Sequence, residues 1–232
     1  MNIPARWKPI ILGPVIVADW IIKRTLSTIM WLAWRSHINL FRLVRGRLDT
    51  PGRFYIDRFL ERYAGESRGR FLEFGDARYK IAFPSAQIER YDVLNIAEGP
   101  DVTVVGDIQS CPQIADNTYD VVVCTQVLEH VPNPFRAAAE LHRILKPGGR
   151  LLLTVPAAYP YHAVPQDYWR FTRDSLQLLF GELFHEVQIE PWGNRVVVVA
   201  AYWYWAYDQL PRDALLRRDP DNPQILSVYA RK

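Results

Sequence analysis

From about residue 53 onward, short apolar runs alternate with segments whose apolar residues recur at helical spacing. The run 119–124 (YDVVVC) is rich in β-branched residues and follows a turn at 116–118, which is typical of a strand buried on both faces. The pattern predicts strands at 70–74, 88–95, 102–105, 119–124, 150–155 and 185–190. Strands separated by helices indicate βαβ units and a parallel sheet.

Two helices are predicted between these strands. Asn133 supplies an N-cap oxygen, and Pro134 takes the first helical position. This helix continues through Leu145 and is predicted to end at the stop signal 146–149, Lys-Pro-Gly-Gly. A second helix is predicted over 173–181. The run 196–207 is apolar throughout, so its periodicity does not distinguish helix from strand. It could form a lid, an oligomer face or a membrane-facing surface.

The cysteine and glycine usage excludes several classes of protein. Cys111 and Cys124 form no CxxC pair, which argues against a disulfide scaffold and a thiolate zinc site and favours a reducing compartment. None of the 12 glycines forms a GxG, so the chain contains no dinucleotide-binding G-x-G-x-x-G fingerprint. The chain also contains no G-x-x-x-x-G-K motif, so a phosphate-binding P-loop is excluded. No metal site is predicted.

Charge is distributed unevenly along the chain. Residues 1–58 contain ten Lys or Arg and three Asp, a sum of +7, which leaves −4 for the remainder of a chain with net charge +3. A net charge this small does not favour nucleic acid as a partner. The asymmetry instead indicates a basic arm that binds a surface.

The basic arm has the pattern of an amphipathic helix between residues 10 and 47. Its longest uncharged apolar stretches are about ten residues, half of what a bilayer-spanning helix needs, and the segment lacks a signal-peptide pattern, so we expect it to be retained. An apolar stripe and a basic arc with interspersed aromatic rings are typical of an interfacial helix on anionic lipid. The alternative is a helix docked on its own domain or on a second subunit. The stripe contains Ile22, Leu26, Ile29, Ala33, Leu40 and Val44, and the basic arc contains Lys23, Arg24, Arg35, Arg42 and Arg45 with Trp31, Trp34 and Phe41.

The run 119–156 (YDVVVCTQVLEHVPNPFRAAAELHRILKPGGRLLLTVP) resembles the fourth strand, following helix and fifth strand of class I S-adenosylmethionine-dependent methyltransferases of the type 11 group. The resemblance extends more loosely over residues 53–232. It implies an α/β, Rossmann-like, doubly wound and mostly parallel seven-stranded sheet with helices on both faces, whose seventh strand is 225–230. We therefore expect a basic helical extension at 1–50 and a methyltransferase domain at 51–232.

The resemblance also implies where S-adenosylmethionine binds, since in such sheets the ligand lies beyond the carboxyl ends of the strands. The family's first loop, D/E-x-G-x-G-x-G, departs here by carrying Ala77 and Tyr79 at glycine positions. The carboxylate after the second strand is replaced by Asn95, with Asp92 as the alternative if the register differs. For Asp107, cofactor binding is favoured over turn capping. The implied cofactor residues are Glu73, Gly75, Ala77, Asn95, Asp107, Ile108, Gln126 and His130.

A second segment, 159–172 (YPYHAVPQDYWRFT), resembles the loop after the fifth strand in a bacterial subset of the family that is associated with polysaccharide and lipid-linked glycan assembly. Asp167, Tyr168, Trp169 and Arg170 are therefore candidate substrate-binding residues. The alternative is that the aromatic rings pack the loop onto the sheet while Asp167 and Arg170 pair at the surface. Methyl transfer to a hydroxyl requires a base, and His162 is the candidate.

The function predicted from these patterns is methyl transfer, with O-methylation of a saccharide, glycolipid or other small acceptor favoured. The alternative is a catalytically degenerate methyltransferase fold that binds or scaffolds, motivated by the altered first loop and Asn95. Nucleic-acid methylation is disfavoured because residues 125–128, TQVL, replace an N/D-P-P-Y/F tetrapeptide. We expect a cytoplasmic protein. The pattern leaves open a peripheral position on the inner face of the cell membrane and the formation of homo-oligomers.

Overall fold

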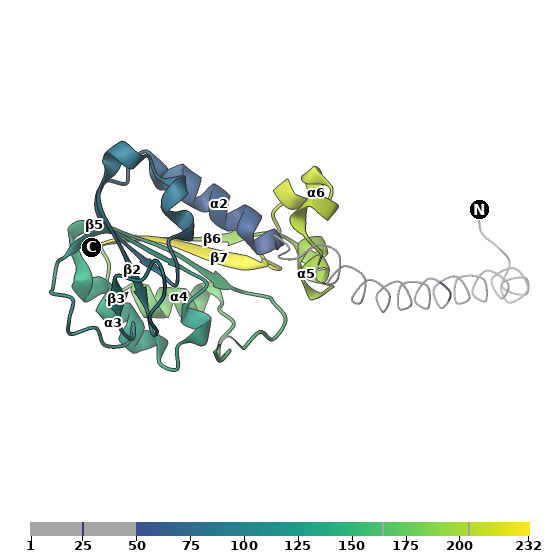
Figure 1. Ribbon diagram of the computed structural model, residues 1–232. Helices are drawn as coiled ribbons and strands as arrows, with labels where there is room; N and C mark the ends of the chain where they lie inside the picture. The colour runs from purple at the N-terminus through teal and green to yellow at the C-terminus, as the bar shows by residue number, and fades with distance from the viewer. Residues whose placement is uncertain (1–24, 26–49, 164, 204) are drawn as a thin grey trace, which may run out of the picture. The chain divides into compact units, whose positions relative to one another are not determined.

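The apolar runs of the sequence form one seven-stranded sheet in the order β3-β2-β1-β4-β5-β7-β6 (Figure 1). The computed structural model describes residue 25 and residues 50–163, 165–203 and 205–232. The strands are β1 (Gly69–Phe74), β2 (Ile88–Asn95), β3 (Val104–Val105), β4 (Tyr119–Thr125), β5 (Leu145–Pro156), β6 (Glu186–Trp192) and β7 (Ile225–Arg231).

Neighbouring strands from β3 to β5 are parallel, whereas β7 runs antiparallel to both β5 and β6. The chain winds outward from β1 in one direction and from β4 in the other, so the strand order reverses between these two strands. This reversal creates a crevice beyond their carboxyl ends, where open α/β sheets bind ligands. The predicted doubly wound, mostly parallel seven-stranded sheet is confirmed.

Helices cover both faces of the sheet (Figure 1). α3 (Pro134–Ile144) and α4 (Arg173–Phe180) pack through residues such as Leu141 and Leu176 into one apolar core. α2 (Pro51–Ala64) and α5 (Arg195–Tyr202) contribute Phe59 and Val197 to the core on the other face. The short helix α6 (Arg212–Leu216) follows α5.

Local capping decides two helix starts. The Asn133 side chain accepts a hydrogen bond from the Arg136 amide at 3.2 Å, as the sequence predicts for an N-cap. Asn194 accepts from the amides of Val196 and Val197 and so begins α5. The ambiguous apolar run after residue 195 is therefore helical up to Tyr202.

Two predicted boundaries differ from the structure. The third strand is reduced to Val104–Val105, and the fifth begins at Leu145 rather than at residue 150. α3 ends at Ile144, and Leu145 already pairs with Tyr119 of β4. The predicted stop signal at 146–149 therefore lies within the strand. Gly148, at φ 78°, provides a left-handed backbone conformation inside it.

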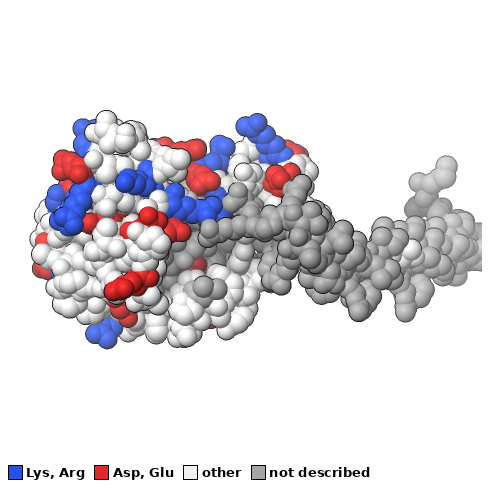
Figure 2. All heavy atoms as spheres, in the orientation of Figure 1, with Lys and Arg blue, Asp and Glu red and all other residues white. Residues whose placement is uncertain are grey.

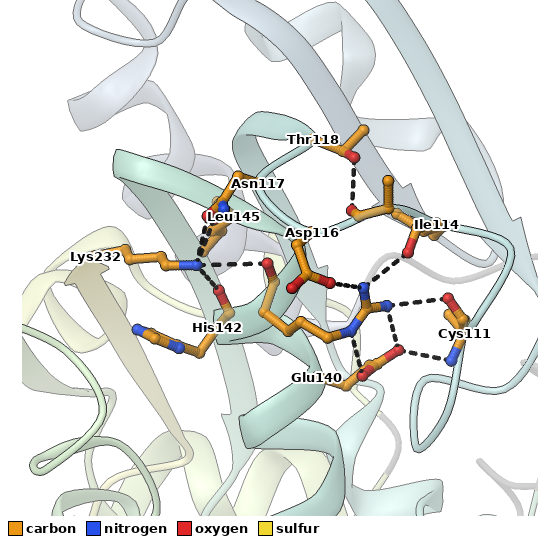
Figure 3. Close-up of polar contacts among 11 residues, drawn as sticks. Cys111, Ile114, Asp116, Asn117, Thr118, Glu140, His142, Leu145 and Lys232 are labelled. Carbon is orange, nitrogen blue, oxygen red and sulfur yellow. Dashed lines mark hydrogen bonds and ion pairs between the residues drawn. The ribbon is translucent and has the colours of Figure 1, made fainter.

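The carboxyl end of α3 is held by a polar cluster that we call the Arg143 network (Figure 3). The Arg143 guanidinium donates to both carboxylate oxygens of Glu140, at 2.9 and 2.7 Å, and to Asp116 at 2.6 Å. It also donates to the carbonyls of Cys111 and Ile114. Nearby, Lys232 Nζ donates to the carbonyls of His142 and Leu145 and to Asn117. The network ties α3 to the segment before β4 and to the end of β7.

Residues 49–232 form a compact unit of their own. Most of the segment 10–47, for which a surface helix is predicted, lies outside the described residues. Among the helices that are described, none has both the length and the hydrophobicity needed to cross a bilayer. On the face of the molecule drawn in Figure 2, basic and acidic side chains are interspersed.

Candidate active site

The crevice beyond the strand ends contains a cavity of about 790 Å³. It lies at the reversal of strand order, where the loops after β1, β2, β3 and β4 converge. Its volume is in the range of small-molecule and cofactor sites. Six of the eight predicted cofactor residues line it: Gly75, Asn95, Asp107, Ile108, Gln126 and His130.

The first two strand ends meet through Gly75 and Asn95. Gly75 has φ +92°, a conformation that residues with a Cβ rarely adopt, and no atom lies within 4 Å of the position a Cβ would take. The Asn95 amide donates to the Gly75 carbonyl at 2.9 Å, and its side-chain oxygen remains an acceptor. Asp92, the alternative from the sequence, is buried and accepts from Arg70 and Arg90. Asn95 is therefore the residue that faces the cavity.

Glu73 and Ala77 are not among the residues that line the cavity, and their contact with the cofactor stays a prediction. The Glu73 carboxylate is 1% exposed and accepts from the Tyr79 amide at 2.9 Å and from the Tyr91 hydroxyl. Burial raises the pKa of Glu73 to about 7. Ala77 borders a separate surface hollow, and the Tyr79 ring is buried in the core. Glu73 thus holds the backbone of the first loop.

Asp107 makes the turn contacts considered from the sequence and also lines the cavity. Its carboxylate accepts from the Gln109 amide at 2.8 Å and from the Gln109 side chain at 2.9 Å, which is turn chemistry. The Gln109 side-chain oxygen in turn accepts from the Asn133 amide. Both Asp107 and Gln109 line the cavity, and Asp107 is exposed. A carboxylate oxygen has more than one lone pair, so Asp107 can still accept from a ligand.

Gln126, at the end of β4, has a positive φ of 54° that is uncommon for a residue other than glycine. Its amide donates to the Thr154 carbonyl at 2.8 Å, and its side chain donates to the Thr154 hydroxyl at 3.2 Å. These bonds to β5 hold the strained backbone in place. Residues held in such conformations cluster at ligand sites.

The loop predicted to bind substrate is organised by an internal ion pair. Arg170 donates to both oxygens of Asp167 at 2.5 and 2.7 Å and to the carbonyls of Tyr159 and Pro160. The Asp167 side chain is 1% exposed, and the hydrogen bonds from Arg170 lower the pKa of Asp167 strongly. The pairing of Asp167 with Arg170, which the sequence offers as the alternative, is confirmed, with the Asp167 carboxylate buried and the Arg170 side chain 28% exposed. Their role in substrate binding stays a prediction.

Tyr168 and Trp169 attach this loop to the end of β4. Both backbone amides donate to the Glu129 carbonyl, at 2.7 and 3.3 Å, and the Trp169 indole donates to the Val131 carbonyl at 2.8 Å. The two side chains remain 48% and 40% exposed, whereas Phe171 is buried. Tyr168 and Trp169 therefore keep ring surface that an acceptor could contact.

Two histidines meet at the junction of cavity and loop. His130 lines the cavity, and its ring centroid lies 5.0 Å from that of His162. The His162 amide donates to Asp167 at 2.8 Å. Burial lowers the pKa of His162 below its ordinary value, against the opposing effect of Asp167, so the ring is neutral near pH 7. His162 is not among the residues that line the cavity.

Glu129 is a residue that sequence reasoning missed. Its carboxylate is fully buried, and neither oxygen has a hydrogen-bond partner in the part of the chain that the structure describes. Burial raises the pKa of Glu129 to about 8. The available signal was its position within V-L-E-H, where a carboxylate follows a buried strand directly.

Comparisons with known proteins agree with this geometry. Residues 77–153 match the family described as "Methyltransferase domain" (Methyltransf_11). The chain is 30% identical over 125 residues to the thiol S-methyltransferase TMT1B of Homo sapiens, which covers 46% of this chain and 51% of that protein. This chain thus spans about half the length of the human relative. It is 39% identical over 54 residues to a ubiquinone biosynthesis O-methyltransferase of Pseudomonas paraeruginosa, covering 22% of this chain and 23% of that enzyme.

Solved structures share the fold at low sequence identity. A SAM-dependent methyltransferase from Archaeoglobus fulgidus superposes with a TM-score of 0.54 at 16% identity and covers 84% of this chain and 99% of its own. A Burkholderia thailandensis 1,6-didemethyltoxoflavin-N1-methyltransferase, solved with 1,6-didemethyltoxoflavin and S-adenosylhomocysteine, superposes with a TM-score of 0.52 at 16% identity and covers 100% and 92% of the two chains.

The cavity fits the cofactor of this family. Asn95 offers an amide oxygen to a ribose hydroxyl, Asp107 offers a carboxylate to an adenine amine, and the open space at Gly75 admits an amino-acid moiety. Bound there, S-adenosylmethionine would supply an electrophilic methyl group on its sulfonium. Residues 77–153 thus match the methyltransferase domain family, within a Rossmann-like fold that solved S-adenosylmethionine-dependent methyltransferases share.

Proposed function

We propose that this protein transfers a methyl group from S-adenosylmethionine to a hydroxyl of a small acceptor, with a saccharide or glycolipid favoured. The observation that carries the proposal is the continuity between the cavity and the loop 159–172. Pro165 and Gln166 of this loop line the cavity together with His130, whose ring contacts that of His162. The half-exposed Tyr168 and Trp169 follow on the same loop.

In this proposal the protein contributes alignment and proton removal. The cavity holds the cofactor so that its methyl group faces the acceptor, which is the main requirement for an in-line displacement. The acceptor oxygen forms a bond to the methyl carbon as the bond from sulfur to that carbon breaks. His162, neutral near pH 7, receives the hydroxyl proton, and its ring contacts that of His130, which lines the cavity.

A glycan acceptor is supported by the rings on the loop. Sugars present flat apolar faces that lie against exposed aromatic rings, and Tyr161, Tyr168 and Trp169 are 76%, 48% and 40% exposed. The relatives named above are described as thiol and ubiquinone-pathway methyltransferases, so thiols and phenols are the competing acceptors.

Methyl transfer from isotopically labelled S-adenosylmethionine tests the acceptor class. The full chain is incubated in parallel with a lipid-linked oligosaccharide, a catechol and an alkyl thiol, and products are identified by mass spectrometry. Label on a saccharide hydroxyl is the expected result. Label on the thiol or the catechol alone would contradict the glycan proposal while retaining methyl transfer.

Cofactor binding is tested through Asp107. Replacing Asp107 by Ala removes one charge-assisted hydrogen bond, so binding of S-adenosylhomocysteine should weaken by about 1.5–3 kcal/mol. Isothermal titration calorimetry measures this, with Asp101→Ala, an exposed carboxylate outside the cavity wall, as the matched control. Absence of binding by the wild-type chain at millimolar cofactor would favour the binding or scaffolding alternative.

We also propose that residues 10–47 bring the enzyme to an anionic membrane surface at the inner face of the cell membrane. Support comes from the sequence pattern alone, an apolar stripe beside a basic arc. The full chain should float with anionic liposomes, detach at high salt and stop floating when residues 1–48 are deleted. If the full chain does not bind anionic vesicles at low salt, the membrane proposal is wrong. The segment would then belong to an interface within the chain or between subunits of a homo-oligomer.

A further inference from the structure

Three side chains at the junction of the cavity and the loop point ligating atoms toward one another. They are the carboxylate of Glu129 and the imidazoles of His130 and His162, whose ligating atoms all lie within 4.8 Å of one another. Glu129 and His130 belong to the short 3-10 helix η4 (Leu128–His130) after β4, and His162 comes from the loop after β5. The fold thus brings together residues that are more than thirty positions apart.

The charge balance of this cluster is incomplete. The Glu129 carboxylate is 0% exposed and has no hydrogen-bond partner among the described residues. Arg170 is the cation whose charge acts on Glu129, but its guanidinium already binds both oxygens of Asp167. A buried carboxylate without a partner is costly, so a positive charge placed between Glu129 and the two histidines would stabilise the site.

His130 is oriented as a ligand. Its Nδ1 contacts the carbonyl of Gln166, and a carbonyl can only accept, so Nδ1 carries the hydrogen of the neutral ring. The Nε2 lone pair is then free and lies 4.0 Å from Glu129 Oε1. That separation is too long for a hydrogen bond. Two ligands that each lie about 2.1 Å from one tetrahedral ion are about 3.4 Å apart, so a small inward movement of the two side chains would bring both atoms to ligand distance. Metal-binding histidines are commonly held in this way by a carbonyl on the second nitrogen.

We propose that Glu129, His130 and His162 bind a divalent transition-metal ion such as Zn²⁺. Two imidazoles and one carboxylate are a donor set that these ions accept, and three protein ligands leave a position open. Because His130 also lines the cavity, the open position adjoins the space proposed for the acceptor.

The role of the ion rests on the proposed function. An acceptor hydroxyl bound at the open position has a lowered pKa and loses its proton to solvent. Its oxygen then forms the bond to the methyl carbon as the sulfur–carbon bond breaks, leaving neutral S-adenosylhomocysteine. In this arrangement His162 is a ligand, and the ion replaces it as the group that activates the hydroxyl.

Calorimetric titration of the chelator-treated full chain with Zn²⁺ tests the inference, with the visible absorption of Co²⁺ as a second readout. The wild type should bind one ion saturably. Glu129→Gln keeps the size of the side chain and the backbone carbonyl that holds Tyr168, and it should weaken binding at least tenfold, as should His130→Asn. The matched control is His185→Asn, which removes an exposed histidine outside the cluster and should bind as the wild type does.

Cooperative thermal unfolding is measured on each variant to establish that it is folded, because His130 lines the cavity proposed for the cofactor. Wild-type protein that shows no saturable Zn²⁺ binding, or Glu129→Gln that binds as tightly as the wild type, would overturn the inference and leave a proton or water at Glu129. Zn²⁺ binding that depends on Glu129, together with no methyl transfer to any acceptor, would support the metal site and overturn the proposed function. Turnover that survives removal of the ion would overturn the ion's role in catalysis.

Discussion

The two ends of α3 adjoin polar clusters that differ in how their charges are satisfied. In the Arg143 network beyond its carboxyl end, the guanidinium binds two carboxylates and two carbonyls, and both oxygens of Glu140 accept hydrogen bonds (Figure 3). In the cluster of Glu129, His130 and His162 before its amino end, a buried carboxylate has no hydrogen-bond partner among the described residues.

We propose that this difference distinguishes a polar cluster that stabilises the fold from one that binds a ligand. A network in which every group is paired gains stability from its hydrogen bonds. A buried acid without a partner lowers stability, and such groups persist where binding or catalysis needs them. Substitutions in the Arg143 network should therefore affect unfolding, and substitutions at the histidines should affect turnover.

The largest effect is expected at His162. Replacing His162 by Ala should lower kcat at least about 100-fold, because hydroxyl activation is lost whether His162 acts as base or as metal ligand. The affinity for S-adenosylhomocysteine should stay within about twofold, since His162 lies outside the cavity wall. Steady-state kinetics and calorimetry measure the two quantities, with His185→Ala as the control. Joint loss of turnover and cofactor affinity would make His162 a structural residue.

In the Arg143 network, Arg143→Met should lower the free energy of unfolding by about 2–3 kcal/mol. The substitution leaves the carbonyls of Cys111 and Ile114 without the guanidinium and leaves Glu140 with the Cys111 amide alone as a donor. The Arg143 side chain is only 28% exposed. Urea unfolding measures the change. Arg136→Met, at an exposed position on the same helix, should have little effect. Equal stability of the two variants would show that the network does not stabilise the fold.

Glu73 offers a test of a buried acid that does have partners. Burial raises its pKa from 4.5 to about 7, so the folded state binds more protons than the unfolded state between these values. Its contribution to stability therefore falls as pH rises through this window. Glu73→Gln cannot ionise, so its stability relative to wild type should rise by about 2–3 kcal/mol between pH 5 and pH 8. Urea unfolding at both pH values measures this, and a constant difference would contradict the shift.

The smallest effect is expected at Lys232, at the edge of the Arg143 network. Its ammonium donates to the carbonyls of His142 and Leu145 at the end of α3, where a positive charge also complements the helix dipole. Lys232→Met keeps the aliphatic stem and should lower the free energy of unfolding by about 1 kcal/mol. Thermal unfolding at low salt measures it. If Lys232→Met lowers the free energy of unfolding as much as Arg143→Met does, the two side chains act as one unit.

Much of the fold was predictable because its signals are local. The β-branched run at 119–124 has the composition of a buried strand wherever it occurs, and Asn133 with Pro134 starts a helix by capping its own amides. The order of these elements predicts a parallel sheet, and the carboxyl ends of its strands converge on one crevice. For that reason, six of the eight residues predicted to bind the cofactor lie in the wall of the cavity.

The sequence by itself determined which residues stand at strand ends, whereas tertiary structure decided which of their side chains face the cavity. Glu73 and Asn95 both end strands, yet Glu73 turns into the core to meet Tyr79 and Tyr91. Asp167 and Arg170 pair inside their loop, and His162 meets His130 and Glu129 from a distant segment. Such contacts depend on how separate loops close over one another. The periodicity of residues describes one segment at a time, so it does not predict which residues of other segments these side chains contact.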